Sequence, residues 1–323
     1  MHSARQSLTG EALGDHMFPT IFGAIAAPAM FGALLDLATR FQPHVMVHEV
    51  AELAAPVVAA ALDRPHVTHG FGLAIPPHRL AVAAAAASAL WDAAGAKPGP
   101  YGGCYDHLYI DIYPPSMQPD DLSYVGRIQQ LRPDSLTRAA GDALPRQLVE
   151  TLNSRDRPAI YLTFGTVFNV NNTFTAAVAA LGRLPEVAGV VTVGPHGEPK
   201  AFGLQPAHVH IARYIPQNDL LPHCVAVASH GGSGTLLGAL AHGIPQLCLP
   251  QGADQFRNAQ ACAAAGAGIA LMGADATTDR IEAALRRLLD APDLRRNAKR
   301  IAAEIAGMPT TEDAVTALEQ LTN

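Results

Sequence analysis

The sequence predicts an α/β protein built from two doubly wound, Rossmann-like domains. Short apolar segments alternate with helical segments along most of the 323 residues, which is the pattern of parallel sheets. The alternation is interrupted by the polar, turn-rich stretch 129–145, which we interpret as a linker. A hydrophobic content of 49% supplies material for two cores. We therefore place the domains at 1–135 and 136–323.

Composition excludes several classes of protein. The formal net charge is −6, so we expect no nucleic acid as a partner. Residues 1–15 lack the apolar core of a secretory signal. The most apolar stretches, 21–38 and 81–90, are interrupted by Pro28 and Asp36 or are too short, so no membrane span is expected. The four cysteines form no C-x-x-C pair, which favours free thiols and a cytoplasmic location.

The first domain is predicted to carry three strands and to be incomplete. A full nucleotide-binding half contains more βαβ units, each of roughly 30 residues. The expected helical segments are Phe18–Arg40, broken near Pro28, Ala54–Leu62 and Pro76–Leu90. The expected strands are Val45–Val47, His66–Thr68 and Leu108–Ile112.

The second domain is predicted to be a doubly wound sheet of six strands. They are expected at Ala159–Phe164, Gly189–Val193, Val209–Ala212, Val225–Ser229, Gln246–Leu249 and Gly268–Leu271. Helices fill the intervals, as the alternation requires. Ligands of such sheets bind beyond the carboxyl ends of the strands, so polar residues that follow each strand are candidate site residues.

The strongest local motif is Ser229–Thr235, with the sequence S-H-G-G-S-G-T. It follows a predicted strand and opens the predicted helix Ser233–Ala241. Its glycines let a ligand approach the backbone, and the first N–H groups of a helix attract anions. A diphosphate is therefore the natural ligand. A turn that only packs tightly is the simpler alternative.

Other site motifs do not fit the chain. No G-x-x-x-x-G-K-[ST] sequence occurs, which excludes a P-loop. Gly231–Thr235 ends in threonine and no G-x-S-x-G elbow is found, which argues against a serine hydrolase. His208 and His210 share a strand face without an evident third ligand, and Asp120 and Asp121 lie in a proline-rich loop. We therefore expect no metal site and no organic cofactor.

A longer stretch surrounds the glycine-rich motif, from Leu220 to Ala259. It contains the strings L-L-P-H-C, H-G-G-S-G-T, A-L-A-H-G-I-P-Q and L-P-Q-G-A-D-Q-F-R-N-A. This stretch resembles the nucleotide-sugar signature of family 1 glycosyltransferases, which have the two-domain GT-B fold. It is most similar to the bacterial members that glycosylate macrolides and other natural products. Weaker similarity covers Tyr161–Thr166, Ile215–Gln217 and two strands of the first domain.

The resemblance implies an inverting, metal-independent glycosyltransferase. It implies transfer of a hexose or deoxyhexose from a UDP- or dTDP-sugar to a hydroxyl group of a small hydrophobic acceptor. The residues implied to hold the donor diphosphate are His230, Gly232, Ser233, Gly234 and Thr235, with Gly165 and Thr166. Those implied to meet the base are Tyr214, Ile215 and Gln217, and those implied to bind the donor sugar are Asp254 and Gln255.

Two residues of the second domain fit the pattern less simply. Asp254 immediately precedes the predicted helix Gln255–Ala265, so a helix N-cap is an alternative role. Many relatives carry Glu at the position of Gly238, where it binds the ribose. Because glycine has no side chain for this contact, the choice between uridine and thymidine stays open.

The acceptor side of the resemblance is carried by Glu49, our candidate catalytic residue. It matches the acidic partner that orients a histidine base in the family; a surface carboxylate at a strand end is the alternative. The strand that precedes that histidine in the family is not found in this chain. His48 and His69 are therefore the candidate substitute bases. We expect the acceptor pocket near Phe71–Ile75 and the helix Ala81–Trp91.

Two other functions fit the same phosphate site. A GT-B nucleotide-sugar 2-epimerase uses it without an acceptor, and a non-catalytic protein uses it only to bind nucleotide sugar. The incomplete first domain motivates the second alternative. It also leaves apolar faces uncovered, which predicts self-association, for example as a homodimer.

Overall fold

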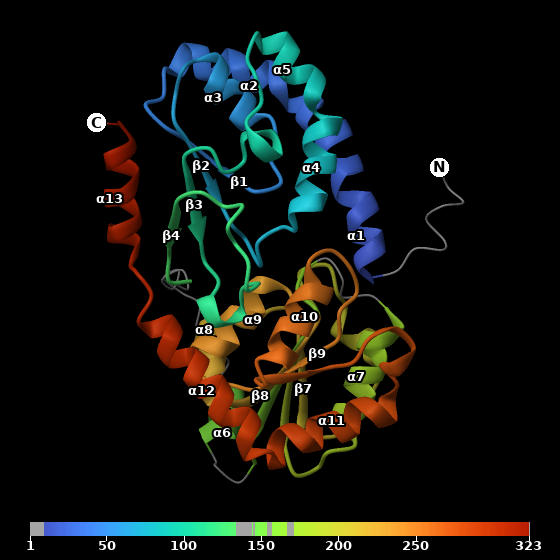
Figure 1. Ribbon diagram of the computed structural model, residues 1–323. Helices are drawn as coiled ribbons and strands as arrows, with labels where there is room; N and C mark the ends of the chain where they lie inside the picture. The colour runs from blue at the N-terminus through green and yellow to red at the C-terminus, as the bar shows by residue number, and fades with distance from the viewer. Residues whose placement is uncertain (1–9, 134–143, 145, 154–156, 167–170, 323) are drawn as a thin grey trace. The chain divides into compact units, whose positions relative to one another are not determined.

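The computed structural model describes residues 10–133, 144, 146–153, 157–166 and 171–322 (Figure 1). By its internal contacts the chain divides into two compact units, Met1–Arg132 with Met308–Asn323, and Pro133–Gly307. The sequence pattern grouped residues 308–323 with the second domain, whereas their contacts place them in the first unit.

The first unit contains a parallel sheet of four strands in the order β1-β2-β3-β4. Its strands are β1 (Met46–Glu49), β2 (His66–His69), β3 (Leu108–Asp111) and β4 (Ile128–Gln130). The prediction of three strands before the linker is wrong by one, because β4 falls where the linker was expected to begin. Ile128 is the only apolar residue of β4 and two glutamines follow it, so no strand pattern is visible in the sequence.

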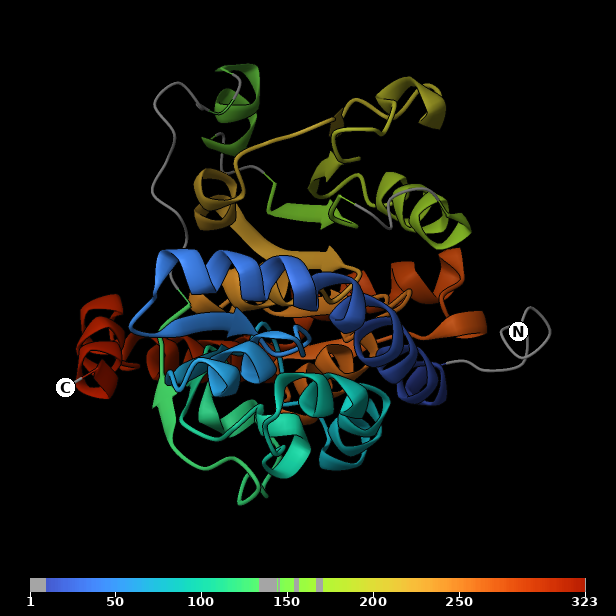
Figure 2. The same ribbon diagram turned by 90° about the horizontal axis from the view of Figure 1, so that it is seen from above.

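The N-terminal helical run is continuous, although a break near Pro28 was expected. It comprises α1 (Gly10–Phe18), the π-helix η2 (Pro19–Ala26) and α2 (Ala27–Phe41), seen along its length in Figure 2. Pro28 lies in the first turn of α2, directly after the π-helical turns. The regular i→i−4 ladder is already replaced there, as the Ala27 N–H to Phe22 C=O bond shows, so the missing proline N–H costs little.

The run Gly10–Phe41 is also, among the described residues, the one helix long and apolar enough to cross a membrane. Its 18-residue window has a mean hydropathy of 1.8, and 17% of that window is buried. The test depends on length and composition only. Exposed apolar side chains lie along it, with Ile25 at 61% and Phe41 at 77% exposure.

Three further α-helices, two short 3₁₀ segments and the C-terminal helix complete the first unit. They are α3 (Ala55–Ala61), α4 (Pro77–Ala86), α5 (Ser88–Ala94), η3 (Pro100–Gly103), η4 (Pro115–Met117) and α13 (Thr311–Thr322). The single helix expected at Pro76–Leu90 is therefore two helices. Helix α13, which was not predicted, packs Ala317 and its neighbours against Val67, Leu108 and Ile110 of the sheet.

The second unit contains the predicted parallel sheet of six strands, in the order β10-β9-β8-β5-β6-β7. The strands are β5 (Ala159–Thr163), β6 (Ala188–Thr192), β7 (Val209–Ala212), β8 (Cys224–Ser229), β9 (Gln246–Cys248) and β10 (Gly268–Ala270). The chain leaves β5 toward β6 on one side, whereas β8 pairs on its other side. Such a switch point opens a crevice at the carboxyl ends of the strands, here after Thr163 and Ser229.

Helices cover this sheet. They are α6 (Arg146–Asn153), α7 (Asn172–Gly182), α8 (Gln217–Leu220), α9 (Ser233–Ala241), α10 (Gln255–Ala264), α11 (Thr278–Asp290) and α12 (Pro292–Ala306), with the 3₁₀ turns η5 (Pro199–Phe202), η6 (Leu221–His223) and η7 (Gly273–Asp275). Helix α7 is N-capped by Asn171, whose Oδ1 accepts the Phe174 N–H at 2.8 Å.

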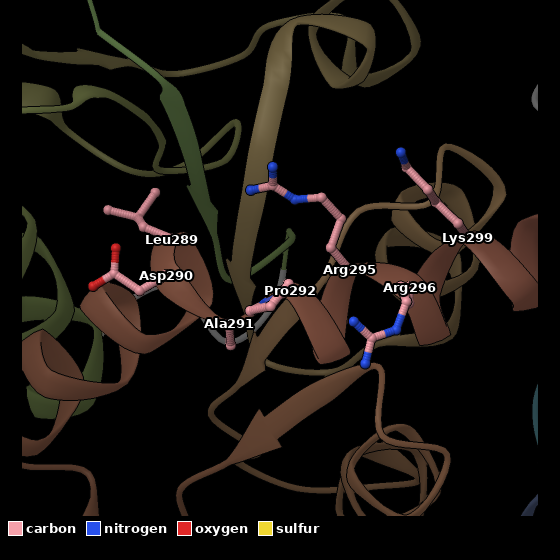
Figure 3. Close-up of a pocket in the computed structure, with 7 residues that line it drawn as sticks. All are labelled: Leu289, Asp290, Ala291, Pro292, Arg295, Arg296 and Lys299. Atoms are coloured by element: carbon pink, nitrogen blue, oxygen red, sulfur yellow. The ribbon is translucent and has the colours of Figure 1, made fainter.

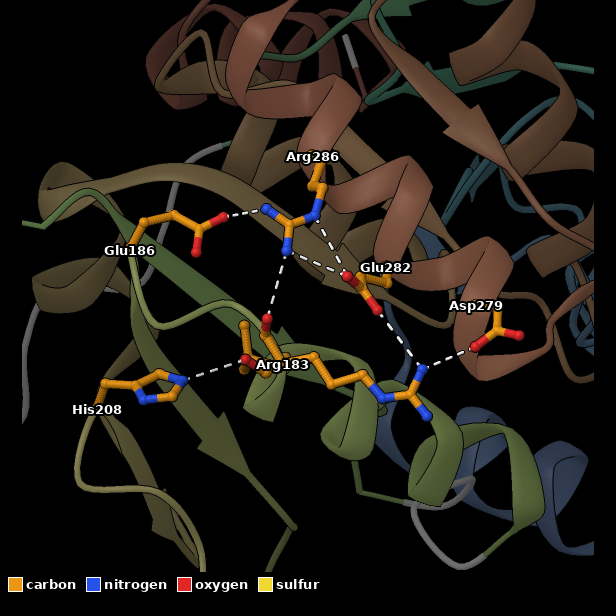
Figure 4. Close-up of polar contacts among 7 residues, drawn as sticks. Arg183, Glu186, His208, Asp279, Glu282 and Arg286 are labelled. Carbon is orange, nitrogen blue, oxygen red and sulfur yellow. Dashed lines mark hydrogen bonds and ion pairs between the residues drawn. The ribbon is translucent and has the colours of Figure 1, made fainter.

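Helices α7 and α11 are joined by charged side chains at their surface (Figure 4). Arg183 contacts Asp279 at 2.7 Å and Glu282 at 3.5 Å, and Arg286 contacts Glu282 at 3.1 Å and also Glu186. These groups are largely exposed, so each pair contributes little. The main stabilisation comes from the buried aliphatic and aromatic cluster beneath them, which contains Ile160, Phe174, Leu181 and Leu285.

Candidate donor site

The turn between β8 and α9 presents free backbone N–H groups at a helix N-terminus. Gly231 has φ = 81°, a left-handed conformation that favours glycine, and its N–H donates to Ser229 Oγ at 3.1 Å. No side chain caps α9, and the first helical bond is from Leu236 N–H to the Gly232 C=O. The N–H groups of residues 233–235 therefore point out of the helix end, where an anion is favoured.

Two glycines make room for the ring of His230. A methyl group added to Gly232 would stand 2.6 Å from Nε2 of His230, and one added to Gly165 would stand 3.0 Å from its Cε1. Gly165 has φ = 68° and follows β5. Burial lowers the pKa of His230, against the opposing effect of the Asp254 charge, so the imidazole is neutral at pH 7. The structure thus brings Gly165, His230 and Gly232 together at the switch point.

Access to the helix end differs between residues. A methyl group added to Gly234 would meet nothing within 4 Å, so the backbone there faces open space. Thr166 is exposed at the end of the β5 turn. Thr235 Oγ1 donates to Gln217 Oε1 at 3.1 Å, which ties α9 to α8.

Asn258 organises the surroundings of Asp254, and sequence reasoning did not single it out. Its buried Nδ2 lies 3.0 Å from the Gly231 C=O, 3.1 Å from Ser233 Oγ and 2.9 Å from Asp254 Oδ2. Ser233 Oγ also donates to Asp254 Oδ2, at 3.1 Å. The spacing of Asn258, one helical turn after Asp254, was the signal in the sequence that could have identified it. The network fixes the Asp254 carboxylate beside the glycine-rich turn.

The alternative role of Asp254 as a helix N-cap is wrong. The residue stands at the N-cap position of α10, but its side chain makes no cap hydrogen bond. Gln255 is buried, and its Oε1 accepts the N–H groups of Gln251 and Gly252 at 2.8 and 3.1 Å. Together with the left-handed Ala253, at φ = 54°, it shapes the loop that precedes α10.

The three residues expected to meet the base differ in exposure. Tyr214 is 67% exposed, whereas Ile215 is 2% exposed and packs in the core. Because the Ile215 side chain is apolar and buried, only its backbone groups could form hydrogen bonds with a ligand. A methyl group added to Gly238 would stand 2.9 Å from Gln217 Nε2, so the Gln217 carboxamide lies over the position that has no side chain.

Glu49 lies at the end of β1 in the first unit. Its Oε2 accepts the Ala51 N–H at 2.6 Å. Desolvation raises the pKa of the Glu49 carboxyl, and the Ala51 bond opposes this rise. Within the described residues, no histidine is hydrogen-bonded to this carboxylate.

The first candidate substitute base, His48, is a buried structural residue. Its Nδ1 lies 3.0 Å from the Glu49 C=O, and its Nε2 lies 3.0 Å from His66 Nδ1 and 3.2 Å from Thr68 Oγ1. Burial lowers the pKa of His48 to about 4. The second, His69, is half-buried, and burial lowers its pKa too.

The described residues contain no group of three or more His, Cys, Asp or Glu that could hold a metal ion. A surface pocket of about 300 Å³ lies between α11 and α12 (Figure 3). Its cations diverge, with Arg295 and Lys299 on one side of α12 and Arg296 on the other. They do not converge on one ligand.

Known proteins resemble this chain over most of its length. The model of the erythromycin biosynthesis protein CIII-like C-terminal domain matches residues 178–321. Elloramycin glycosyltransferase ElmGT of Streptomyces olivaceus is 31% identical over 87% of this chain and 69% of its own length. L-demethylnoviosyl transferase of Streptomyces niveus is 34% identical over 89% and 73%. The chain belongs to the antibiotic glycosyltransferases.

Solved structures of natural-product glycosyltransferases have the same fold. Spinosyn rhamnosyltransferase SpnG superposes with a TM-score of 0.79 at 28% identity, covering 98% of this chain and 83% of that one. Its complex with thymidine diphosphate gives a TM-score of 0.78. The expected GT-B fold and the resemblance to macrolide-type glycosyltransferases are confirmed. This glycosyltransferase covers only part of the length of these relatives.

Proposed function

We propose that this glycosyltransferase moves a hexose or deoxyhexose from a dTDP- or UDP-sugar to a hydroxyl group of a small hydrophobic acceptor, with inversion and without a metal ion. The observation that carries the proposal is the uncapped N-terminus of α9, with Gly231 and Gly232 holding the backbone open beside His230. The similar glycosyltransferases SsfS6 and SpnG have structures in complex with thymidine diphosphate, which favours the thymidine donor.

The leaving diphosphate is stabilised by the backbone. The N–H groups of residues 233–235 and the α9 dipole face the charge that develops as the sugar–phosphate bond breaks. The neutral His230 supplies a further ring N–H. Because these backbone dipoles are already oriented before the reaction, they need little reorganisation as the charge develops. They therefore take the role that a cation has in metal-dependent transferases.

The other donor groups follow from the same crevice. The Asp254 carboxylate, held by Asn258 and Ser233, accepts hydrogen bonds from sugar hydroxyl groups. We assign the sugar-facing contact of Gln255 to its amide nitrogen, because its oxygen is used by the loop. The exposed ring of Tyr214 stacks on the base, the Ile215 backbone meets its edge, and Gln217 faces the nucleoside.

On the acceptor side we assign Glu49 as the carboxylate that takes part in removing the acceptor proton. Desolvation raises the pKa of the Glu49 carboxyl, and a raised pKa makes a carboxylate a stronger general base. His48 is excluded by its own contacts, because both ring nitrogens are engaged.

A transfer assay in EDTA tests the proposal. We expect glycoside from dTDP-glucose and a phenolic acceptor without added metal, with the opposite anomeric configuration in the product. Activity that EDTA abolishes and magnesium restores would contradict the helix-terminus mechanism. Release of free dTDP without formation of glycoside would favour an epimerase. We place the reaction in the cytoplasm, since the four cysteines are buried free thiols.

We also propose that two copies associate through the exposed apolar side chains of η2 and α2. Ile25, Leu37 and Phe41 are 61%, 55% and 77% exposed, and Ala29 and Ala33 lie between them at helical spacing. An antiparallel pair centred on Ala33 sets Leu37 against the small Ala29 and Phe41 against Ile25 of the other copy. Sedimentation should show a dimer that Phe41→Glu dissociates; a monomer at all concentrations would refute it.

A further inference from the structure

The loop that follows β2 is fixed by hydrogen bonds at both of its ends. The Gly70 N–H donates to the Ile110 C=O at 2.8 Å, the Ala74 N–H to Gln118 Oε1 at 3.0 Å, and Tyr124 Oη to the Ile75 C=O at 3.1 Å. Leu73, Ala74 and Ile75 are buried. The loop is therefore a rigid part of the first unit.

One side chain of this loop points outward. Phe71 is 38% exposed, between Gly70 and Gly72, which are buried. A methyl group added to Gly70 would stand 2.3 Å from the Tyr109 hydroxyl oxygen, so the backbone under Phe71 rests directly on β3. An aromatic ring on a fixed loop at the carboxyl end of a parallel strand is well placed for a ligand.

The loop is connected to a buried carboxylate. Asp111, at the end of β3, has no exposed surface. Its Oδ1 accepts the Tyr113 N–H at 2.9 Å and Gln118 Nε2 at 2.8 Å, and its Oδ2 accepts Gln130 Nε2 at 3.0 Å. Burial raises the pKa of Asp111, and these three donors oppose the rise. Gln118 is thus held at one end by Asp111 and holds Ala74 at the other.

Stability alone does not require this arrangement. Burying a carboxylate costs free energy that an apolar residue of similar size would not incur. What a fully bonded polar network supplies is a single conformation. Here the conformation that it fixes is that of the Phe71 loop.

We propose that Asp111 and Gln118 are positioning residues that fix the loop Gly70–Pro76 so that Phe71 presents its ring to the hydrophobic acceptor. The inference rests on the proposed function, because it assigns the acceptor to this loop of the first unit. Asp111 and Gln118 act through Phe71 and do not touch the acceptor themselves.

Three variants distinguish the positioning of the Phe71 loop from a purely structural role of Asp111 and Gln118. Gln118→Leu keeps a side chain of comparable volume but removes both hydrogen bonds. Gln129→Leu is the matched control, because Gln129 lies in the same sheet and donates only to the Gln130 C=O. Asp111→Asn is the conservative variant: its oxygen still accepts from Tyr113 and Gln118, and its amide can donate to Gln130 Oε1, which has no partner within the described structure.

The measurements are hydrogen exchange of the Ala74 amide, acceptor KM and kcat, and dTDP affinity, with 4-methylumbelliferone as the phenolic probe. Gln118→Leu and Phe71→Ala should each raise the acceptor KM about tenfold, with kcat and dTDP affinity unchanged. Ala74 should exchange faster in Gln118→Leu only. Asp111→Asn and Gln129→Leu should have the acceptor KM and kcat of the parent. The double variant Phe71→Ala/Gln118→Leu should have the same acceptor KM as Phe71→Ala alone.

Two results would overturn the proposal. One is faster Ala74 exchange in Gln118→Leu with an unchanged KM and an unchanged affinity for the probe, which would make the network purely structural. The other is a Phe71→Ala variant that binds the probe as the parent does. If the parent binds the probe through Phe71 but forms no glycoside, the proposed function fails and the loop assignment stands.

Discussion

His230 and His48 have opposite surroundings, although both follow or lie in strands of parallel sheets. His230 lies between Gly165 and Gly232, where a side chain on either residue would clash with its ring. His48 is buried against His66 and Thr68. Sequence spacing identified both, but only contacts show that the second is unavailable for catalysis.

The buried histidines predict acid sensitivity. His48 and His66 have pKa values of about 4 and 3 in the folded protein, against 6.5 ordinarily, because burial disfavours their charged forms. The unfolded chain therefore binds more protons below pH 6.5, so the free energy of unfolding is highest above pH 6.5 and falls as the pH drops toward 4. The His48 share is on the order of 3 kcal/mol.

Chemical unfolding between pH 7.5 and 4.5 measures this effect. His48→Gln should be less stable at pH 7.5 yet show a flatter pH dependence than the parent. His210→Gln, at an exposed site, is the control and should leave the profile unchanged. Equal slopes in the parent and His48→Gln would refute the assignment.

Glu49→Gln tests the acceptor-side carboxylate. Loss of a general acid–base group lowers kcat by about 10²–10⁴, whereas dTDP affinity should not change. Because the base acts deprotonated and its pKa is raised, the parent rate should fall on the acid side at a pH above the usual range for Glu. Glu52→Gln is the matched control, since that carboxylate accepts the Ala54 and Ala55 N–H groups; a kcat loss equal to that of Glu49→Gln would argue against a specific role.

At the level of elements, the sequence pattern was sufficient to predict strands that are buried on both faces of a sheet. Strands β5, β6, β8 and β9 are almost entirely buried, and all six strands of the second sheet were predicted. The pattern was insufficient for β4, whose glutamines bond to side chains and backbone of neighbouring residues, and for α13, which has a narrow apolar stripe. Asp111 was missed because its bond to Gln130 joins residues 19 apart in sequence and no local period reveals it. Asn258 was missed although Asp254 lies one helical turn before it, because its other partners, Gly231 and Ser233, are distant in sequence.

Helix α7 offers a test at this scale. Asn171→Ala removes the bond to the Phe174 N–H and should lower the free energy of unfolding by about 1 kcal/mol. Asn172→Ala changes the same residue type one position later, inside the helix, and should be neutral or slightly stabilising. Urea unfolding of the two variants distinguishes a cap from propensity, and equal losses would contradict the cap.

For the whole molecule, each unit carries a distinct part of the proposed reaction. All the donor-site residues lie in the unit Pro133–Gly307, and Glu49 and the Phe71 loop lie in the other. A variant in one unit should therefore change either the donor affinity or the acceptor KM, but not both. The alternation predicted two Rossmann-like domains, and the resemblance to family 1 glycosyltransferases implied the GT-B fold. The division at residues 308–323 depends on contacts that only the folded chain shows.

Calorimetric titration with dTDP in EDTA tests the diphosphate site at the N-terminus of α9 most directly. We expect binding without metal, weakened in His230→Ala and Thr235→Ala by about 1–3 kcal/mol each, the scale for lost hydrogen bonds to a charged group. His242→Ala, at the C-terminal end of the same helix, should bind as the parent does. Unchanged affinity in both His230→Ala and Thr235→Ala, or equal weakening in His242→Ala, would contradict the site.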